Sequence, residues 1–174
     1  MTSVSSVSAS SVVSGSGGTV FSSRSSGGSS RMSSGMELGE AFVLTLRMTL
    51  RPLAGVQGRV AIGPYRGAPQ DGGYRLVILT GAGASVPAFA LERQDAGGGT
   101  ETLATYDGPL RIEDGQEREI RWTRDGGGEM TISIDGKAIL SARDRSLAGG
   151  FDGVVLVNSG GDVEVGAIET EGAD

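Results

Sequence analysis

The sequence predicts an all-β protein, an antiparallel β-sandwich of one domain, from three observations. Apolar and polar residues alternate with a period of two over several short runs, which is typical of strands with one buried face. Gly, Asp and Pro separate these runs at intervals of roughly 8–14 residues. Gly, with 31 residues in a chain of 174, interrupts every stretch that would be long enough for three helical turns. No room remains for the crossover helices of a parallel sheet, so antiparallel pairing is expected.

The clearest strand covers residues 42–51, where every second residue is apolar until Pro52 ends the run. Residues 74–80 (YRLVILT) are almost continuously apolar, which indicates a central strand covered on both faces. Other strands of the first half are expected at 59–62, 86–94, 101–106 and 110–112. The pair Gly63-Pro64 is expected to end the first of these.

The second half is organised around a hairpin at Asp135-Gly136. These residues lie between alternating runs at 129–134 and 137–142, and Asp-Gly is a strong signal for a type I′ turn, which needs positive φ twice. Further strands are expected at 117–124, 151–158 and 163–170. So many short strands with regular turns favour a sandwich or a barrel.

Residues 1–35 differ in composition and are expected to form an N-terminal arm, with the sandwich domain covering residues 36–174. Sixteen of these 35 residues are Ser and six are Gly, and apolar residues are sparse. Such a segment cannot bury enough apolar surface to offset its ordering entropy alone. Two alternatives stay open: a flexible leader, or an assembly arm that docks on a neighbouring subunit by adding strands or by wrapping.

Composition and charge exclude several chemistries. The chain has no Cys and no His, which removes disulfides, thiolate zinc sites and the commonest general base. The net charge of −6 divides into +2 over residues 1–35, from two Arg, and −8 over the remainder, from 13 basic and 21 acidic residues. A domain this acidic repels phosphate backbones and anionic lipid surfaces, so nucleic acid is not an expected partner.

Export and membrane signals are also missing from the sequence. No run approaches the roughly 20 apolar residues that span a bilayer, so membrane insertion is not expected. The N-terminus, MTSVSSVSAS, lacks the basic start and the apolar run of a secretory signal. The chain is therefore expected to be made in the cytoplasm and used without that export route.

The segment from Glu117 to Asp162 reads EREIRWTRD, then GGGEMTISIDGKAIL, then GGFDGVVLVNSGGD. This succession of a Trp-bearing strand, an Asp-Gly hairpin and a Phe-x-Gly strand resembles the concanavalin A-like and laminin-G-like jelly-roll domains. The earlier runs FVLTLRMTLRP and YRLVILTGAG are similar to the first strands of those domains. The resemblance implies that the sandwich is a jelly roll.

Glycoside hydrolases of that superfamily carry paired acids on one strand, spelled roughly E-x-D-x-x-E, as nucleophile and general acid. No such spelling occurs here. The nearest acidic pairs, Glu117/Glu119 and Glu169/Glu171, are interpreted as solvated faces of edge strands. With no His and no Ser-x-x-Lys pattern, nothing activates a Ser nucleophile. No catalytic residue is assigned, and the protein is not expected to be an enzyme.

Laminin-G-like domains often bind Ca²⁺ at the sandwich rim through Asp and Asn oxygens. The resemblance makes Asp152, Asn158 and Asp162 the candidates for such a site. Asp-Gly and Gly-Asp are also ordinary turn sequences, and that simpler interpretation is preferred. No metal and no other cofactor is therefore assigned.

Aromatic side chains offer a second kind of candidate site, because aromatic faces stack on sugar rings. Trp122 stands beside Ile120 in a strand, which favours a place in the core. Tyr65 and Tyr106 lie next to turns, near the ends of strands, where a binding rim would be. These two tyrosines are the candidate ligand-binding residues.

Two functions follow from these observations. The main prediction is a non-enzymatic structural protein, a subunit of a virion, tail or surface filament that docks through its arm and forms homo-oligomers. It rests on the long arm, the missing export signal and the missing catalytic groups, and it implies a place in a virion or another extracellular particle. The alternative is a lectin-like carbohydrate-binding module, with Ca²⁺ dependence left open, which the resemblance alone implies.

Overall fold

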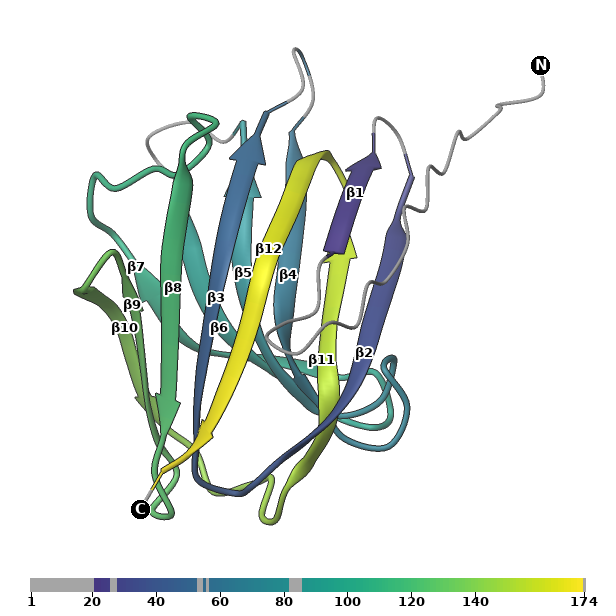
Figure 1. The fold of residues 1–174 in the computed structure, drawn as a ribbon, viewed down its shortest axis with the longest axis vertical. Helices are drawn as coiled ribbons and strands as arrows, with labels where there is room; N and C mark the ends of the chain where they lie inside the picture. The colour runs from purple at the N-terminus through teal and green to yellow at the C-terminus, as the bar shows by residue number, and fades with distance from the viewer. Residues whose placement is uncertain (1–20, 26–27, 53–54, 56, 82–85, 174) are drawn as a thin grey trace.

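The computed structural model describes residues 21–25, 28–52, 55, 57–81 and 86–173. They form two six-stranded antiparallel sheets, which Figure 1 shows as two layers. The strands are β1 (Phe21–Ser25), β2 (Ser30–Leu38), β3 (Phe42–Arg51), β4 (Gly58–Tyr65), β5 (Gly73–Thr80), β6 (Phe89–Gln94), β7 (Thr100–Tyr106), β8 (Glu117–Arg124), β9 (Glu129–Ile134), β10 (Lys137–Arg143), β11 (Phe151–Asn158) and β12 (Gly161–Gly172). The first sheet has the order β1-β12-β3-β8-β9-β10, and the second has the order β2-β11-β4-β5-β6-β7. The predicted all-β sandwich is confirmed.

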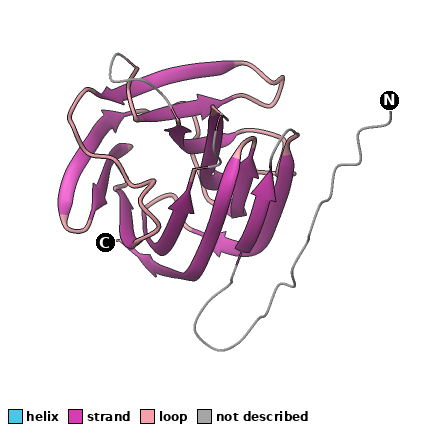
Figure 2. Ribbon diagram, turned by 90° about the horizontal axis from the view of Figure 1, so that it is seen from above, coloured by secondary structure: helices cyan, strands magenta, loops and turns pink. Residues whose placement is uncertain are grey.

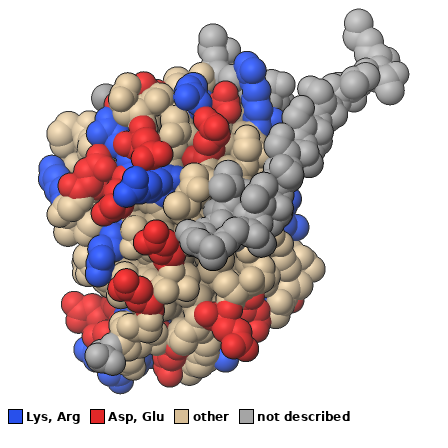
Figure 3. Space-filling view, in the orientation of Figure 1, with Lys and Arg blue, Asp and Glu red and all other residues tan. Residues whose placement is uncertain are grey.

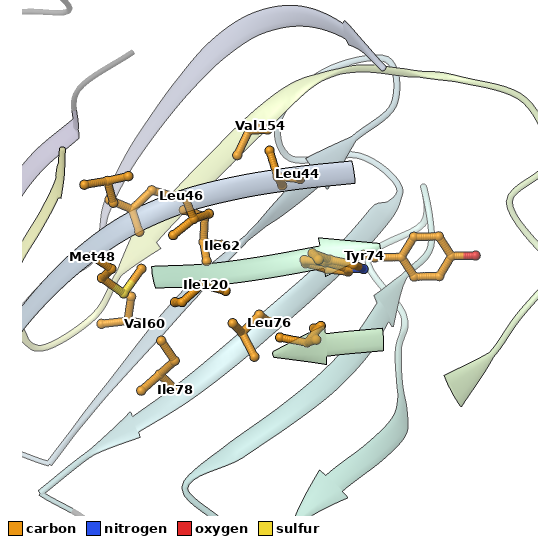
Figure 4. Packing of buried hydrophobic residues seen from close by; sticks show 14 of the residues in the cluster. Leu44, Leu46, Met48, Val60, Ile62, Tyr74, Leu76, Ile78, Ile120 and Val154 are labelled. Carbon is orange, nitrogen blue, oxygen red and sulfur yellow. The ribbon is translucent and has the colours of Figure 1, made fainter. Parts of the chain in front are cut away.

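The core lies between the inner faces of the two sheets, as the view from above in Figure 2 indicates. The strict alternation of β3 buries Leu44, Leu46 and Met48 on one side, as predicted, and these residues meet apolar residues of β4, β5 and β8 (Figure 4). Trp122 is 1% exposed and packs beside Phe42, so its predicted place in the core is confirmed. Among the described residues, no helix is long and apolar enough to cross a membrane.

The hairpin between β9 and β10 turns at the two predicted residues. Asp135 has a φ of 49° and Gly136 a φ of 80°, and Lys137 pairs with Ile134 across the turn. Positive φ at both positions is what a type I′ turn requires. The register of the C-terminal half follows from this turn.

Two strands lie within the segment that was expected to be an arm. β1 pairs with β12 at the edge of the first sheet, and β2 pairs with β11 at the edge of the second. Phe21 is fully buried in the core, and Met32 and Met36 pack against it. The boundary expected at residue 35 therefore lies inside β2. A few buried apolar residues and pairing with the edges of β11 and β12 suffice to order this Ser-rich segment. The rest of the expected arm, residues 1–20, lies outside the described residues.

The other differences concern strand ends. β4 continues through Gly63-Pro64 to Tyr65, the strand expected from residue 86 begins at Phe89, and residues 110–112 form no strand. Pro64 is tolerated because the ladder between β4 and β5 has no pair at residues 63 and 64, so its missing N–H is not needed there.

A buried polar cluster lies between the strand ends at the lower end of the sandwich, in the view of Figure 1. Asp144 accepts hydrogen bonds from the Ser146 amide (2.6 Å) and from Arg93 (2.7 Å). Arg124 donates to the carbonyls of Glu40, Asp144 and Leu147 and lies 5.6 Å from the centre of the Tyr74 ring. Burial would raise the pKa of Asp144, but the hydrogen bonds from Ser146 and the Arg93 charge outweigh burial and lower it.

Candidate ligand-binding face

The outer face of the second sheet carries a strip of short, buried side chains. The neighbours of Ala61 and Val77 along β4 and β5 point into the core, so these two side chains point outward, as does Val155 of β11. All three are at most 2% exposed, although they face away from the core. Ala90 of β6 continues the strip, since it pairs with Val77.

A charged pair crosses this strip. Arg59 of β4 donates to the carboxylate of Glu92 of β6, with β5 lying between the two strands. The Arg59 side chain is 43% exposed and that of Glu92 is 15% exposed. The pair uses one N–H of the guanidinium and one carboxylate oxygen, so further donors and acceptors of both groups remain for another molecule.

Arg75 lies next to this pair and fills the gap in the ladder between β4 and β5. Its Nη1 donates to the carbonyls of Pro64 and Tyr74 at 2.8 Å each, and its Nη2 donates to Pro69 at 3.2 Å. The side chain is opposite Glu92 in the register of β5 and β6. Burial, reinforced by repulsion from Arg31 and Arg59, lowers the pKa of Arg75 to about 10, so this residue still carries its charge at neutral pH.

Polar side chains of β6 and β7 complete the face. Gln94 donates to the carbonyl of Gln70 at 2.9 Å. Thr102 is opposite Glu92 and Thr105 is opposite Ala90, and both threonines are exposed. All these groups sit on paired strands of a packed sandwich, which holds a site in place more firmly than loops do.

The structure does not bring the two candidate tyrosines together. Tyr65 ends β4 at the lower end of the second sheet and its ring lies against Gly153, on the outer face but only 7% exposed. Tyr106 ends β7 at the upper end, where its ring packs on Phe89 with centroids 5.7 Å apart. The two residues are at opposite ends of the sheet and cannot form one rim.

Asp152 stands apart from the other two Ca²⁺ candidates, Asn158 and Asp162, which flank the turn between β11 and β12. Asp152 and Asn158 stand at opposite ends of β11, about 20 Å from each other at the rise of a strand. Asp152 accepts from the Gly67 amide at 2.7 Å, and the buried Asn158 donates to the carbonyls of Ser23 and Gly161. Among the described residues no group of three His, Cys, Asp or Glu side chains could hold a metal. Asn158 instead connects β1 to the turn between β11 and β12.

The acidic pairs Glu117/Glu119 and Glu169/Glu171 are exposed, as expected. β8 and β12 are interior in the strand order, but β9 pairs with β8 only at residues 120–124 and β1 pairs with β12 only at 161–165, so at both acidic pairs the ladder runs to β3 alone. Acidic and basic side chains interleave on that sheet's outer face, which Figure 3 shows. Glu117 pairs with Arg47 at 3.6 Å and Glu164 with Arg51 at 3.2 Å. Ordinary surface pairing accounts for this face.

Arg59, Arg75 and Glu92 were not singled out from the sequence. The one signal available was Arg75 itself, a charge within the nearly continuous apolar run YRLVILT. A charge in a strand covered on both faces needs hydrogen-bond partners and so marks a special position. Arg59 and Glu92 are 33 residues apart, and only the register of three strands brings them together.

No protein-family model and no curated protein matches the sequence. Solved structures do match its fold. A carbohydrate-binding module, CBM66 from Bacillus subtilis, superposes with a TM-score of 0.66 at 15% identity, over 95% of this chain and 94% of that one. A tetrameric galectin from the ball sponge Cinachyrella sp. matches with a TM-score of 0.61 at 15% identity, over 80% and 98%. Sheep galectin-11 matches with a TM-score of 0.54 at 13% identity, over 83% and 98%.

These neighbours overturn the main functional prediction. They are carbohydrate-binding modules and galectins, so the prediction of a virion, tail or filament subunit is wrong. Its premise fails as well for residues 21–35, which supply strands to their own sandwich instead of reaching for a neighbour. The jelly-roll resemblance is confirmed at the level of the fold: the two-sheet sandwich is similar to the jelly rolls of galectins and of a carbohydrate-binding module.

Proposed function

We propose that this protein is a lectin-like carbohydrate-binding module that holds a glycan on the outer face of β4–β7 without turnover. The observation that carries the proposal is the Arg59–Glu92 pair, fixed on rigid strands above a strip of short side chains. The fold neighbours, which are carbohydrate-binding proteins, support the ligand class. Fold alone does not give function, so the chemistry of this face carries the rest.

The chemistry suits a sugar because neighbouring hydroxyl groups both donate and accept hydrogen bonds. A guanidinium offers a planar fork of donors, and a carboxylate offers acceptors that form short, strong bonds. Arg59 and Glu92 place these two groups side by side, and Thr102 and Gln94 add neutral polar groups nearby. Arg59 and Glu92 reach across the strip that holds Ala61 and Val77, which are at most 2% exposed, so a sugar on this face would contact the polar groups of the pair.

Binding without hydrolysis follows from the carboxylate count on this face. Glycoside hydrolysis ordinarily needs two carboxyl groups roughly 5–9 Å apart. Among the outward-pointing residues of β4–β7, Glu92 is the one carboxylate. A single carboxylate that is already paired with an arginine can accept hydrogen bonds from a sugar but lacks the partner acid.

The test is a glycan array followed by calorimetry on the best ligand. Arg59→Ala with Glu92→Ala should reduce affinity for that ligand at least tenfold, because both polar groups of the pair are lost. Arg47→Ala with Glu117→Ala is the matched control, since it removes an ion pair of the same type from the opposite face. Thermal melts of both double variants should show that each remains folded.

Equal loss in both double variants would place the glycan elsewhere. No binding by the wild-type chain to any glycan would remove the proposal altogether. If the Arg59/Glu92 double variant retains its affinity, the protein is still a lectin, but the glycan does not bind on the outer face of β4–β7.

A further inference from the structure

We infer that the glycan this face takes is anionic and carries a carboxylate or a sulfate group. The inference rests on the proposed function and specifies its ligand class. Three arginines, Arg31, Arg59 and Arg75, share the outer face of the second sheet with one nearby carboxylate, Glu92. The local charge is therefore +2, from three positive charges and one negative charge, on a chain whose net charge is −6.

Arg31 is the arginine that is free to meet a ligand. It lies on β2 and is exposed, and the register sets it in line with Val157, Ala61 and Val77 across the sheet. Two inter-strand spacings, about 10 Å, separate its backbone from that of β4. Among the described residues no ion pair engages Arg31. The acid on the outer side of β2 is Glu37, which stands six residues from Arg31, about 20 Å along the strand.

Arg75 adds a charge that no ligand needs to touch. The Arg75 guanidinium donates its hydrogen bonds to carbonyl oxygens and to no carboxylate, and the residue is 3% exposed. A charge held inside the protein is screened less by water and salt than an exposed one, so its field acts on a group bound above it. Glu92 lies between Arg59 and Arg75, and its single negative charge can neutralise only one of these two positive charges.

The opposite face shows that this excess is not a general property of the surface. There Arg47 pairs with Glu117 and Arg51 pairs with Glu164. Arginine forks match the planar geometry of carboxylate and the oxygens of sulfate, which suits Arg31 and the free donors of Arg59 to an acidic sugar.

The test compares acidic glycans with their uncharged parents on the wild-type chain. The pairs are an oligogalacturonate beside its methyl ester, sialyllactose beside lactose, and a sulfated galactan oligosaccharide beside its desulfated form. At least one acidic member should bind about tenfold or more tightly than its parent at low salt. The ratio should shrink as sodium chloride approaches 1 M, where screening acts within about 3 Å. The first two pairs report on carboxylates and the third on sulfates.

Arg31→Gln supplies the second arm of the test. It should weaken binding of the preferred acidic glycan about threefold to fivefold, the range of an exposed charge pair, and leave binding of the neutral parent unchanged. Arg121→Gln, an exposed arginine of β8 on the first sheet, should change neither.

The outcomes separate the two proposals. Equal binding of acidic and neutral members would overturn the anionic ligand and leave the lectin in place. Binding of neither member of any pair, or of any other glycan, would overturn both. An acidic preference that survives unchanged in Arg31→Gln would refute the role of this face in it.

Discussion

Arg75 fills the place where the ladder between β4 and β5 is interrupted at Pro64. Pro64 cannot donate to the ladder, and Arg75 supplies the missing donors by bridging the carbonyls of Pro64 and Tyr74. Gly63 and Gly73 flank the gap, and a side chain on either would collide with a carbonyl oxygen, of Tyr74 or of Pro64 respectively. The arrangement depends on the planar fork of the guanidinium, which reaches three carbonyls at once.

Arg75→Lys should therefore destabilise the fold by about 1–2 kcal/mol, because an ammonium group cannot bridge the same three acceptors and leaves buried carbonyls unpaired. Chemical denaturation of both proteins measures the difference. Arg121→Lys, exposed on the other sheet, should shift stability by less than about 0.5 kcal/mol. If the Arg75→Lys variant is as stable as the wild-type protein, the interruption of the β4–β5 ladder does not require the planar guanidinium.

Gly136→Val should cost about 1 kcal/mol or more, since φ is 80° at this position and a β-branched residue rarely adopts it. A side chain at Gly136 meets no atom within 4 Å, so the loss would come from the backbone alone. Gly126→Val is the matched control, because Gly126 also has open space around its Cα and no positive φ. Equal melting temperatures for the two variants would contradict this account.

At the scale of elements, the sequence predicted most strands of the body because their alternation is strict and their turns are rich in Gly and Asp. It missed β1 and β2 because their inward residues include Ser23, Ser25 and Ser34, which carry no apolar signal. Ordering of these strands comes from partners more than a hundred residues later in the chain. A local pattern cannot report such contacts.

Removing residues 1–19 should leave the sandwich folded, because every described strand remains. Removing residues 1–35 should lower the melting temperature sharply or prevent folding, because the fully buried Phe21 and the anchor Met32 are lost with β1 and most of β2. Circular dichroism melts of the two shortened chains decide the matter. A stable chain beginning at Met36 would show that β1 and β2 are dispensable.

The polar cluster at the lower end should make stability sensitive to acid. Hydrogen bonds lower the pKa of Asp144 in the folded state, so its contribution is present above its unfolded pKa of about 3.9 and is lost as pH falls through the folded value. Asp144→Asn should cost about 1–2 kcal/mol at pH 7, since Arg93 keeps its exposed acidic partners. Melts between pH 2 and pH 7 should show the two proteins converging in acid; a constant difference would argue against the titration of Asp144.

At the scale of the whole molecule, the sequence predicted the architecture but not the site. Fold class follows from repeated local patterns, whereas the Arg59–Glu92 pair depends on the register of strands β4, β5 and β6. Side chains chosen from the sequence for their chemistry, Tyr65 and Tyr106, proved to be packing residues at opposite ends of one sheet. The extracellular location inferred from the sequence stays a prediction.

Calcium should leave the melting temperature unchanged, and EDTA should have no effect on the untreated protein. Asp152 and Asn158 lie too far apart for the coordination distances of roughly 2.3–2.6 Å that Ca²⁺ requires. Differential scanning calorimetry with and without the ion checks this. A reproducible rise that EDTA reverses would point to a site built from other residues.

The strand order also dictates when the chain can fold during its synthesis. β12, the last strand made, inserts between β1 and β3, and β11 inserts between β2 and β4. Until β11 is made, β2 and β4 keep unpaired edges, and until β12 is made, β1 and β3 do so; such edges can pair with another nascent chain. A chain that reaches Asn158 has all six strands of the second sheet, but the first sheet stays open until β12 is made. A chain truncated before Phe151 lacks both inserted strands and should be found in aggregates.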